Sequence, residues 1–149
     1  NEFTGVDAVR AQITRNTTRD AFHQLEATFK ANAGMDQGVI MADLEARDDQ
    51  SSAETVVDNA ASSSAGAVGY LGLSALTLGG YTNIIVKIRD STDDNTYADL
   101  ITFTAVTSAP ASERKTASGT VNRYAKATWA WTGAGSGETA TFAVGMKRG

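Results

Sequence analysis

Residues 120–132, TVNRYAKATWAWT, decide the fold class because apolar and polar side chains alternate along them. One set of alternate positions is apolar apart from Arg123, and it holds Val121, Ala125, Ala127, Trp129 and Trp131. The intervening positions hold Tyr124, Lys126 and Thr128. Successive side chains of a β-strand point to opposite faces, so this period of two predicts a strand with one face in the core. Arg123 lies near the strand start, where we expect it to reach solvent or a carboxylate.

Similar short runs, rich in β-branched and aromatic residues, recur after Gly66 at roughly ten-residue spacing. They cover residues 67–78, 82–89, 98–106, 113–117, 120–132 and 138–146. Turn-forming residues separate the runs, and no helical pattern alternates with them. This rhythm predicts a mainly β protein with an antiparallel β-sandwich of the jelly-roll or immunoglobulin-like kind. Its expected core comprises Val86, Ile88, Leu100, Phe103, Trp129 and Phe142.

Residues 18–34, TRDAFHQLEATFKANAG, have two interpretations. Phe22, Leu25 and Phe29 fall at helical spacing, and Gly34 suits a helix C-cap. A period of two instead places Leu25 and Phe29 on one face of a strand, together with His23 and Ala27. Local propensity favours the helix, so the N-terminal arm is expected to include a short one.

A polar, small-residue stretch over residues 45–64 is the best boundary candidate in the chain. It separates the N-terminal part from the strand-rich part that follows. We therefore predict an N-terminal arm, or the end of a tube-like domain, over residues 1–48. A β-sandwich domain over residues 49–149 follows it.

Charge is distributed unevenly along the 149 residues, which carry a net charge of −4. The stretch 36–58 has one base, Arg47, and seven acids: Asp36, Asp43, Glu45, Asp48, Asp49, Glu54 and Asp58. Residues 111–149 have two acids, Glu113 and Glu138, and six bases: Arg114, Lys115, Arg123, Lys126, Lys147 and Arg148. Opposite poles on one chain predict head-to-tail contacts between copies, with two unrelated solvated faces as the alternative. The assembly candidates are Asp36, Asp43, Asp48, Asp49, Arg114, Lys115, Arg123, Lys147 and Arg148.

Several classes of function lack support in the sequence. The net negative charge argues against specific nucleic-acid binding, and no apolar stretch reaches the roughly 20 residues that span a membrane. The single histidine, His23, is far from any nucleophile motif, so we expect no catalytic residue and no cofactor. Residues 90–99 offer Asp and Asn oxygens to calcium, but a solvated turn explains them equally, and we expect no metal site. The two tryptophans fit the core better than a sugar-stacking platform.

The C-terminal part resembles a module that recurs in structural proteins of tailed bacteriophages, especially tail tube (major tail) proteins. The stretches that carry the resemblance are VDNAASSSAGAVGYLGLSAL at residues 57–76, IIVKIRDSTDD at 84–94, ADLITFTAV at 98–106, GTVNRYAKATW at 119–129 and TFAVGMKRG at 141–149. In that module such stretches are successive strands of a β-sandwich following a tube-forming domain. Residues 25–46 are similar to the end of such a domain, which implies a strand at 25–29 instead of a helix. Residues 1–24 are too few for a whole tube domain, so a stand-alone decoration, connector or filament subunit is the other implication.

The resemblance implies a virion structural protein, extracellular as part of the phage particle, and not an enzyme. We expect it to assemble with copies of itself into rings or a helical stack in which neighbouring strands continue one another's sheets. Other virion proteins are further expected partners. The alternative is a carbohydrate-binding or capsid-decoration module that contacts a host-surface glycan.

Overall fold

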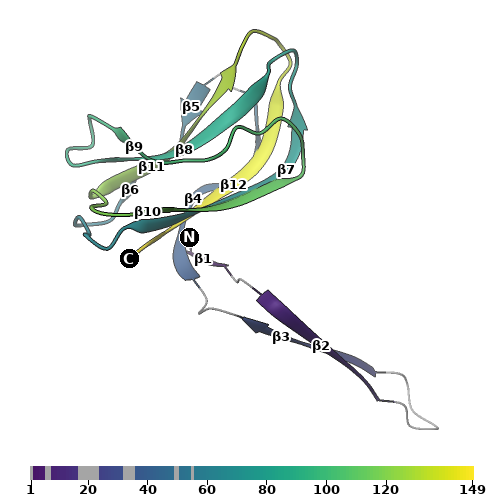
Figure 1. The fold of residues 1–149 in the computed structure, drawn as a ribbon. Coiled ribbons are helices and arrows are strands. Elements are labelled where there is room, and N and C mark those ends of the chain that lie inside the picture. The colour runs from purple at the N-terminus through teal and green to yellow at the C-terminus, as the bar shows by residue number, and fades with distance from the viewer. Residues whose placement is uncertain (1, 6–7, 17–23, 32–35, 49–50, 55) are drawn as a thin grey trace. The chain divides into compact units, whose positions relative to one another are not determined.

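The computed structural model describes residues 2–5, 8–16, 24–31, 36–48, 51–54 and 56–149 (Figure 1). These residues form twelve β-strands, and no helix is present among them. They divide into two compact units, one over Phe3–Gln37 and one over Gly38–Gly149 together with Glu2. The unit boundary falls about ten residues before the sequence-based boundary at 48/49, because β4 (Asp36–Arg47) pairs with the C-terminal strand β12 (Thr139–Arg148).

The smaller unit contains most of β1 (Glu2–Gly5) and the antiparallel pair formed by β2 (Ala8–Asn16) and β3 (Gln24–Ala31). The helix expected over residues 18–34 is wrong over Gln24–Ala31, which is strand β3. Pairing with β2 supplies the backbone hydrogen bonds of this strand and outweighs a small local preference for helix. His23 and the rest of that segment lie outside the described residues.

The larger unit is an antiparallel β-sandwich, as predicted. One sheet has the order β4-β12-β7-β10, with β1 next to β4 in the strand order. Its strands are β4 (Asp36–Arg47), β12 (Thr139–Arg148), β7 (Ala67–Thr77) and β10 (Ala111–Ala117). The second sheet has the order β5-β11-β8-β9, and β6 also pairs with β11. Its strands are β5 (Ser51–Ala53), β6 (Val57–Asp58), β11 (Tyr124–Thr132), β8 (Asn83–Ser91) and β9 (Ala98–Thr102).

The core between the sheets follows the alternation seen in the sequence. Ile84, Val86 and Ile88 of β8 are fully buried, and Trp129 and Trp131 of β11 are 5% and 7% exposed. The predicted core residues Phe103 and Phe142 are also buried, whereas Leu100 is only partly buried against the cluster. The prediction that both tryptophans belong to the core is thereby confirmed, and their rings are not available as an exposed sugar platform.

Candidate assembly surface

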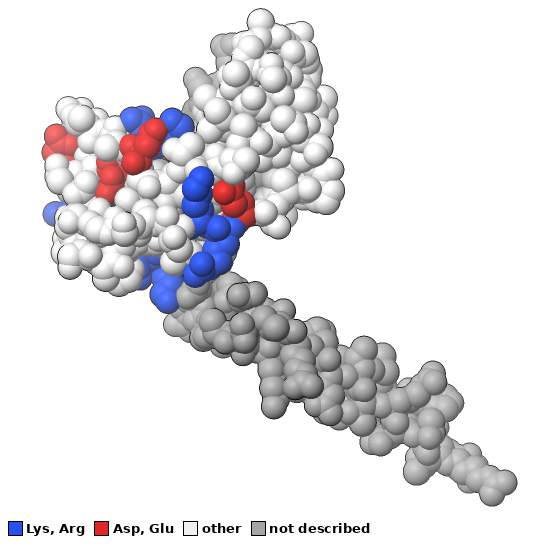
Figure 2. Space-filling model, in the orientation of Figure 1, with Lys and Arg blue, Asp and Glu red and all other residues white. Residues whose placement is uncertain are grey.

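Because neighbouring strands run antiparallel, the loops of the sandwich lie at its two opposite ends. β12 runs from Thr139 to Arg148, and ten residues of strand span roughly 33 Å. Loops 78–82 and 104–110 and residues 133–137 lie at the Thr139 end and contain no charged residue, so we call this the uncharged end. The name refers to these residues alone, because Glu138 before β12 and Asp48 after β4 lie at the same end. Loops 59–66, 92–97 and 118–123 lie at the Arg148 end together with residues 147–149, and we call this the charged end. Figure 2 shows the difference as a lobe free of blue and red atoms on the visible face, at the upper right.

Backbone hydrogen bonds hold the uncharged end together. Tyr81 N donates to Leu78 O, and Ser136 N donates to Gly79 O across the two loops. Gly79 has φ +57°, and a Cβ atom there would lie 2.3 Å from the carbonyl oxygen of Ser136. No other residue type therefore fits this close approach without a shift of the backbone. Apart from Leu78 and Pro110, the side chains that these loops expose are small or polar ones of alanine, serine and threonine, and glycine supplies the rest of the surface.

Two hollows open at the uncharged end. The first, of about 430 Å³, lies around Leu71, Val106 and Pro110 and is bordered by polar loop residues and by Glu113 of β10, whose carboxylate accepts a hydrogen bond from Thr104 N. The second, of about 580 Å³, is the acidic pocket, lined by Asp48, Tyr81, Gly135, Ser136, Gly137, Glu138 and Thr139. Its carboxylates belong to the turn before β12 and to the residue after β4, because Arg47 and Ala140 are paired in register. Both hollows are open to solvent, so they suit contact with a surface better than enclosure of a small substrate.

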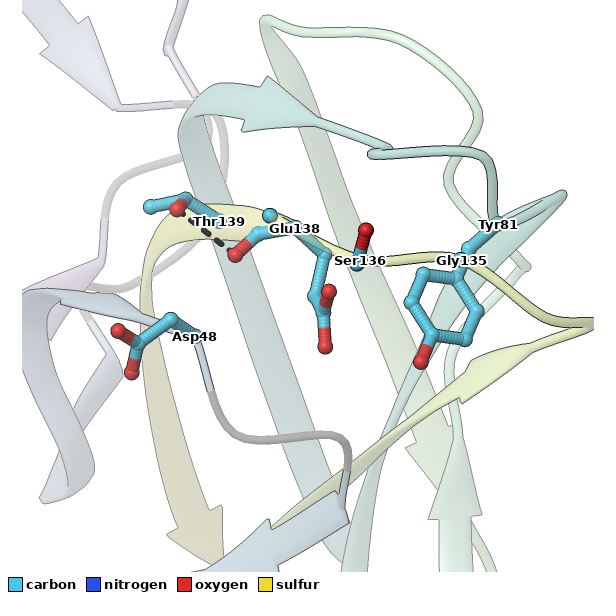
Figure 3. Close-up of a pocket in the computed structure, with 7 residues that line it drawn as sticks. Asp48, Tyr81, Gly135, Ser136, Glu138 and Thr139 are labelled. Carbon is cyan, nitrogen blue, oxygen red and sulfur yellow. Dashed lines mark hydrogen bonds between the residues drawn. The ribbon is translucent and has the colours of Figure 1, made fainter.

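Figure 3 shows how the side chains of the acidic pocket lie. The Glu138 carboxylate and the Tyr81 hydroxyl point in the same direction, whereas the Asp48 carboxylate points away from Glu138 (Figure 3). Glu138 is 8% exposed, and Asp48 is exposed. The Tyr81 ring contacts the Trp131 ring at a centroid distance of 5.8 Å, so one wall of the pocket rests on the core. Thr139 Oγ1 donates a hydrogen bond of 2.8 Å to the Glu138 carbonyl.

The charged end is held by polar side chains. Arg123 Nη2 lies 2.6 Å from Asp58 Oδ2, and Arg123 Nε donates to Asp58 Oδ1. The hydrogen bonds from Arg123 and from Ala60 N lower the pKa of Asp58 to about 2. Arg148 donates to the carbonyls of Asn59 and Ala61. The carboxylate expected near Arg123 is therefore that of Asp58.

The aspartates of residues 90–99 have separate partners. Asp93 accepts hydrogen bonds from Thr96 N, Ser91 Oγ and Asn95 N, which lower its pKa to about 2. Asp99 pairs with Lys87 and Arg89, and Asp90 accepts from Asn122 N. Within the described part of the chain, no group of three acidic or histidine side chains is placed to hold a metal ion. The loop geometry is that of an Asx-type turn.

The assembly candidates do not form one cluster. Among the described residues, Asp43 is exposed on β4, Arg114 and Lys115 are exposed on β10, and Lys147 and Arg148 end β12. Asp36 is the first residue of β4, and Asp49 lies outside the described residues. Asp58, from the acidic stretch 36–58, and Arg123, from the basic stretch 111–149, form an ion pair within one chain. Asp48 and Lys147 lie at opposite ends of the sandwich, so only a second copy brings such groups together.

Arg47 is a structural residue that the sequence pattern did not reveal. It is 7% exposed, and its guanidinium donates to Glu54 Oε1 and to the carbonyls of Asp43, Glu45 and Phe142. The pairing of β4 with β12 has a β-bulge at this point, between Phe142 and Val144. A bulge leaves ladder groups unpaired, and Arg47 satisfies these carbonyls. The side-chain alternation of a bulged strand is irregular, which hides this role from the sequence.

No family model matches this chain, and neither a curated protein nor a solved structure is significantly similar to it. Among the residues that the structure describes, no helix is long and apolar enough to cross a membrane.

Proposed function

We propose that this protein is a virion structural subunit of a tailed phage, in its tail, that assembles with copies of itself into rings or a helical stack. The virion assignment comes from the resemblance of residues 57–76, 84–94, 98–106, 119–129 and 141–149 to the β-sandwich module of tail tube proteins. The contact between copies is end to end, and it buries the uncharged end of one sandwich.

The absence of charge from the loops of the uncharged end is the observation that carries the proposal. Interface cores are depleted in charged residues, because an unpaired charge loses its hydration on burial. Backbone hydrogen bonds join loop 78–82 to residues 133–137 and Val106 to Ile84, so docking orders little additional backbone at these positions. A neutral, prearranged surface of this kind is suited to repeated contact with an identical subunit.

Strand edges are a weaker choice for this contact. The outer strand β10 carries Arg114 and Lys115, and the outer strand β9 carries Asp99 in its ion pair with Lys87. Charged side chains on an edge strand disfavour edge-to-edge pairing with another sheet. We therefore favour end-to-end contact over the continued sheets expected from the sequence.

The β2–β3 pair gives additional support. Within the described residues these two strands pair only with each other. A two-stranded sheet is marginally stable in water by itself, so contact with further protein would stabilise it. A second copy of the chain is one source of that contact.

The test places a charge at the uncharged end. Ser108 is exposed in loop 104–110, and Ser108→Lys buries an unpaired ammonium group in the proposed contact. Thr116→Lys, on the exposed face of β10, is the matched control. Sedimentation velocity should detect concentration-dependent large species for the parent and for Thr116→Lys, and a loss of most of them for Ser108→Lys. Equal unfolding midpoints should show that both variants fold.

Two results would overturn the proposal. A parent chain that stays monomeric up to millimolar concentration would exclude self-assembly. Undiminished assembly of Ser108→Lys would exclude the uncharged end as the contact.

A further inference from the structure

A groove of about 640 Å³ lies on the second sheet and carries an excess of positive charge. Its charged lining residues are Lys87 and Arg89 of β8, Lys126 of β11 and Asp99 of β9. The two β8 residues alternate with the buried core residues of that strand, so the groove is on the face of the sheet that points away from the core. One carboxylate and three cations leave two positive charges in excess, and we call this surface the basic groove.

The pairing register makes this charge excess unfavourable. Lys126 lies directly opposite Arg89 in the pairing of β11 with β8, and like charges at such positions destabilise a sheet. The single carboxylate is shared, because Lys87 Nζ lies 2.6 Å from Asp99 Oδ2 and Arg89 Nε lies 2.9 Å from Asp99 Oδ1. Lys126 Nζ lies over the Tyr97 ring, 3.8 Å from its centroid. A further carboxylate in the groove would offset the repulsion among the three cations, so the groove favours an anionic ligand.

The groove also has an apolar part. Ile85 of β8 lies opposite Ala130 of β11, and Ala53 of β5 lies next to them on the other side of β11. These lining side chains provide neither charge nor hydrogen bonds. A ligand that combines carboxylates with a short apolar side chain therefore matches both parts of the groove.

Residues 43–46 of β4 have this combination, and we call them the bulge segment. The β-bulge in the pairing of β4 with β12 interrupts the alternation here, so that Asp43, Leu44, Glu45 and Ala46 are all exposed. Leu44 is 61% exposed, and no other large hydrophobic side chain among the described residues is exposed. The Asp43 and Glu45 carboxylates have no hydrogen bond or ion pair with any residue that the structure describes. The segment thus presents two free carboxylates on either side of an exposed leucine.

We infer that the basic groove of one copy binds the bulge segment of a second copy. The two negative charges of the segment match the two positive charges that the groove has in excess, and Leu44 can cover Ile85. A carboxylate that joins these cations forms charge-assisted hydrogen bonds. The chain itself thereby supplies the ligand chemistry that its groove selects.

This contact rests on the proposed function and adds a second interface to it. The groove belongs to the second sheet and the bulge segment to the first, so each copy uses the two surfaces for two different neighbours. Such a contact is heterologous, and it closes into a ring or continues as a helix. A stack of rings needs one contact around the ring and one along the axis. The groove provides the first, and the uncharged end provides the second.

The contact is isolated by mixing two variants of the full chain, both with Ser108→Lys to remove the end-to-end contact. The reporter chain also carries Asp43→Asn and Glu45→Gln, so its groove is intact and its bulge segment is uncharged. The donor chain instead carries Lys126→Glu, so its bulge segment is intact and its groove repels carboxylates. Isotope labelling of the reporter alone makes the backbone amide signal of Ala130, which lines the groove, a monitor of binding.

We expect a saturable shift of this signal as unlabelled donor is added. A control donor that also carries Asp43→Asn and Glu45→Gln should bind about tenfold more weakly, because it keeps the shape of the segment and lacks its charges. Leu44→Ser in the donor should weaken binding as well, through loss of the apolar contact. Thr116→Lys in the donor, on the exposed face of β10, should leave the affinity unchanged.

Two results of this titration would overturn the inference. One is the absence of a saturable shift, and the other is equal affinity of the donor and the control donor. Unfolding midpoints establish that each variant folds. Should Lys126→Glu fail to fold, Lys126→Gln takes its place in the donor.

Sedimentation velocity of the single variants separates this inference from the proposed function. Lys126→Glu alone should reduce the large species of the parent chain, as Ser108→Lys does. Loss of assembly in Ser108→Lys but not in Lys126→Glu would overturn the groove contact and leave the end-to-end contact in place. The opposite pattern, together with binding of donor to reporter, would refute the end-to-end contact and retain the groove contact.

Discussion

The two ends of the sandwich are stabilised by different interactions. The charged end contains the exposed pair of Arg123 and Asp58, whose side chains are 43% and 46% exposed, and the turn around Asp93. The half nearer the uncharged end contains one buried arginine, Arg47, against Trp129 and Phe142, with ring-centroid distances of 5.2 and 4.4 Å. Solvent screens exposed charges, whereas a buried group depends on every partner it has. We therefore expect the free energy of unfolding to fall more when a buried group such as Arg47 is replaced than when the exposed ion pair of Arg123 and Asp58 is removed.

The largest expected effect is at Trp129, the buried ring that contacts both Arg47 and Phe142. Trp129→Ala leaves a cavity between the sheets and should reduce the free energy of unfolding by roughly 3–5 kcal/mol. Urea titration at neutral pH measures this change. A loss below about 1 kcal/mol would mean that Trp129 contributes little to the core.

Arg47→Leu should have the next largest effect. Leucine retains an apolar contact with Trp129 but leaves the carbonyls of Asp43, Glu45 and Phe142 without their donor, at a cost of about 3 kcal/mol. Arg47→Lys keeps the charge but cannot make all these contacts, so its stability should fall between the two. The same urea titration measures both variants. Equal free energies of unfolding for Arg47→Leu and the parent would contradict the role of Arg47 as hydrogen-bond donor at the bulge.

The third effect is a pH dependence confined to the charged end. Hydrogen bonds lower the pKa of Asp93 to about 2 in the folded protein, compared with about 3.9 in an unfolded chain. A depressed pKa stabilises the fold above the unfolded value, and this contribution is lost as pH falls from about 4 to 2. Asp93→Asn should therefore flatten the dependence of the urea midpoint on pH in this window. A slope equal to that of the parent would show that Asp93 is not responsible.

The smallest effect is expected for Arg123→Gln. The pair with Asp58 is almost half exposed, so water replaces most of the lost interaction and the melting temperature at pH 7 should change little. The substitution should also return the pKa of Asp58 toward its ordinary value, which weakens the acid-dependent stability at the same end. A melting temperature lowered as far as that of Arg47→Leu would remove the distinction between the two ends.

The sequence by itself determined the fold class and the faces of the central strands. Alternation in residues 120–132 and around Val86 predicted the sandwich and the buried positions of Trp129 and Trp131, because core burial requires a period of two on a strand. It also predicted that Arg123 would reach solvent or a carboxylate. Alternation of this kind indicates which face of a strand packs against the core.

Only the tertiary structure decided which residues meet at each end. Loops 78–82, 104–110 and 133–137 are far apart in sequence, and antiparallel pairing alone brings them to one surface with Asp48 and Glu138. The buried arginine at the β4 bulge depends on the pairing of β4 with β12. For Gln24–Ala31 the sequence offered both a helix and a strand, and pairing with β2 decided for the strand. Non-local hydrogen bonding therefore determined the parts of this protein that its composition and periodicity left open.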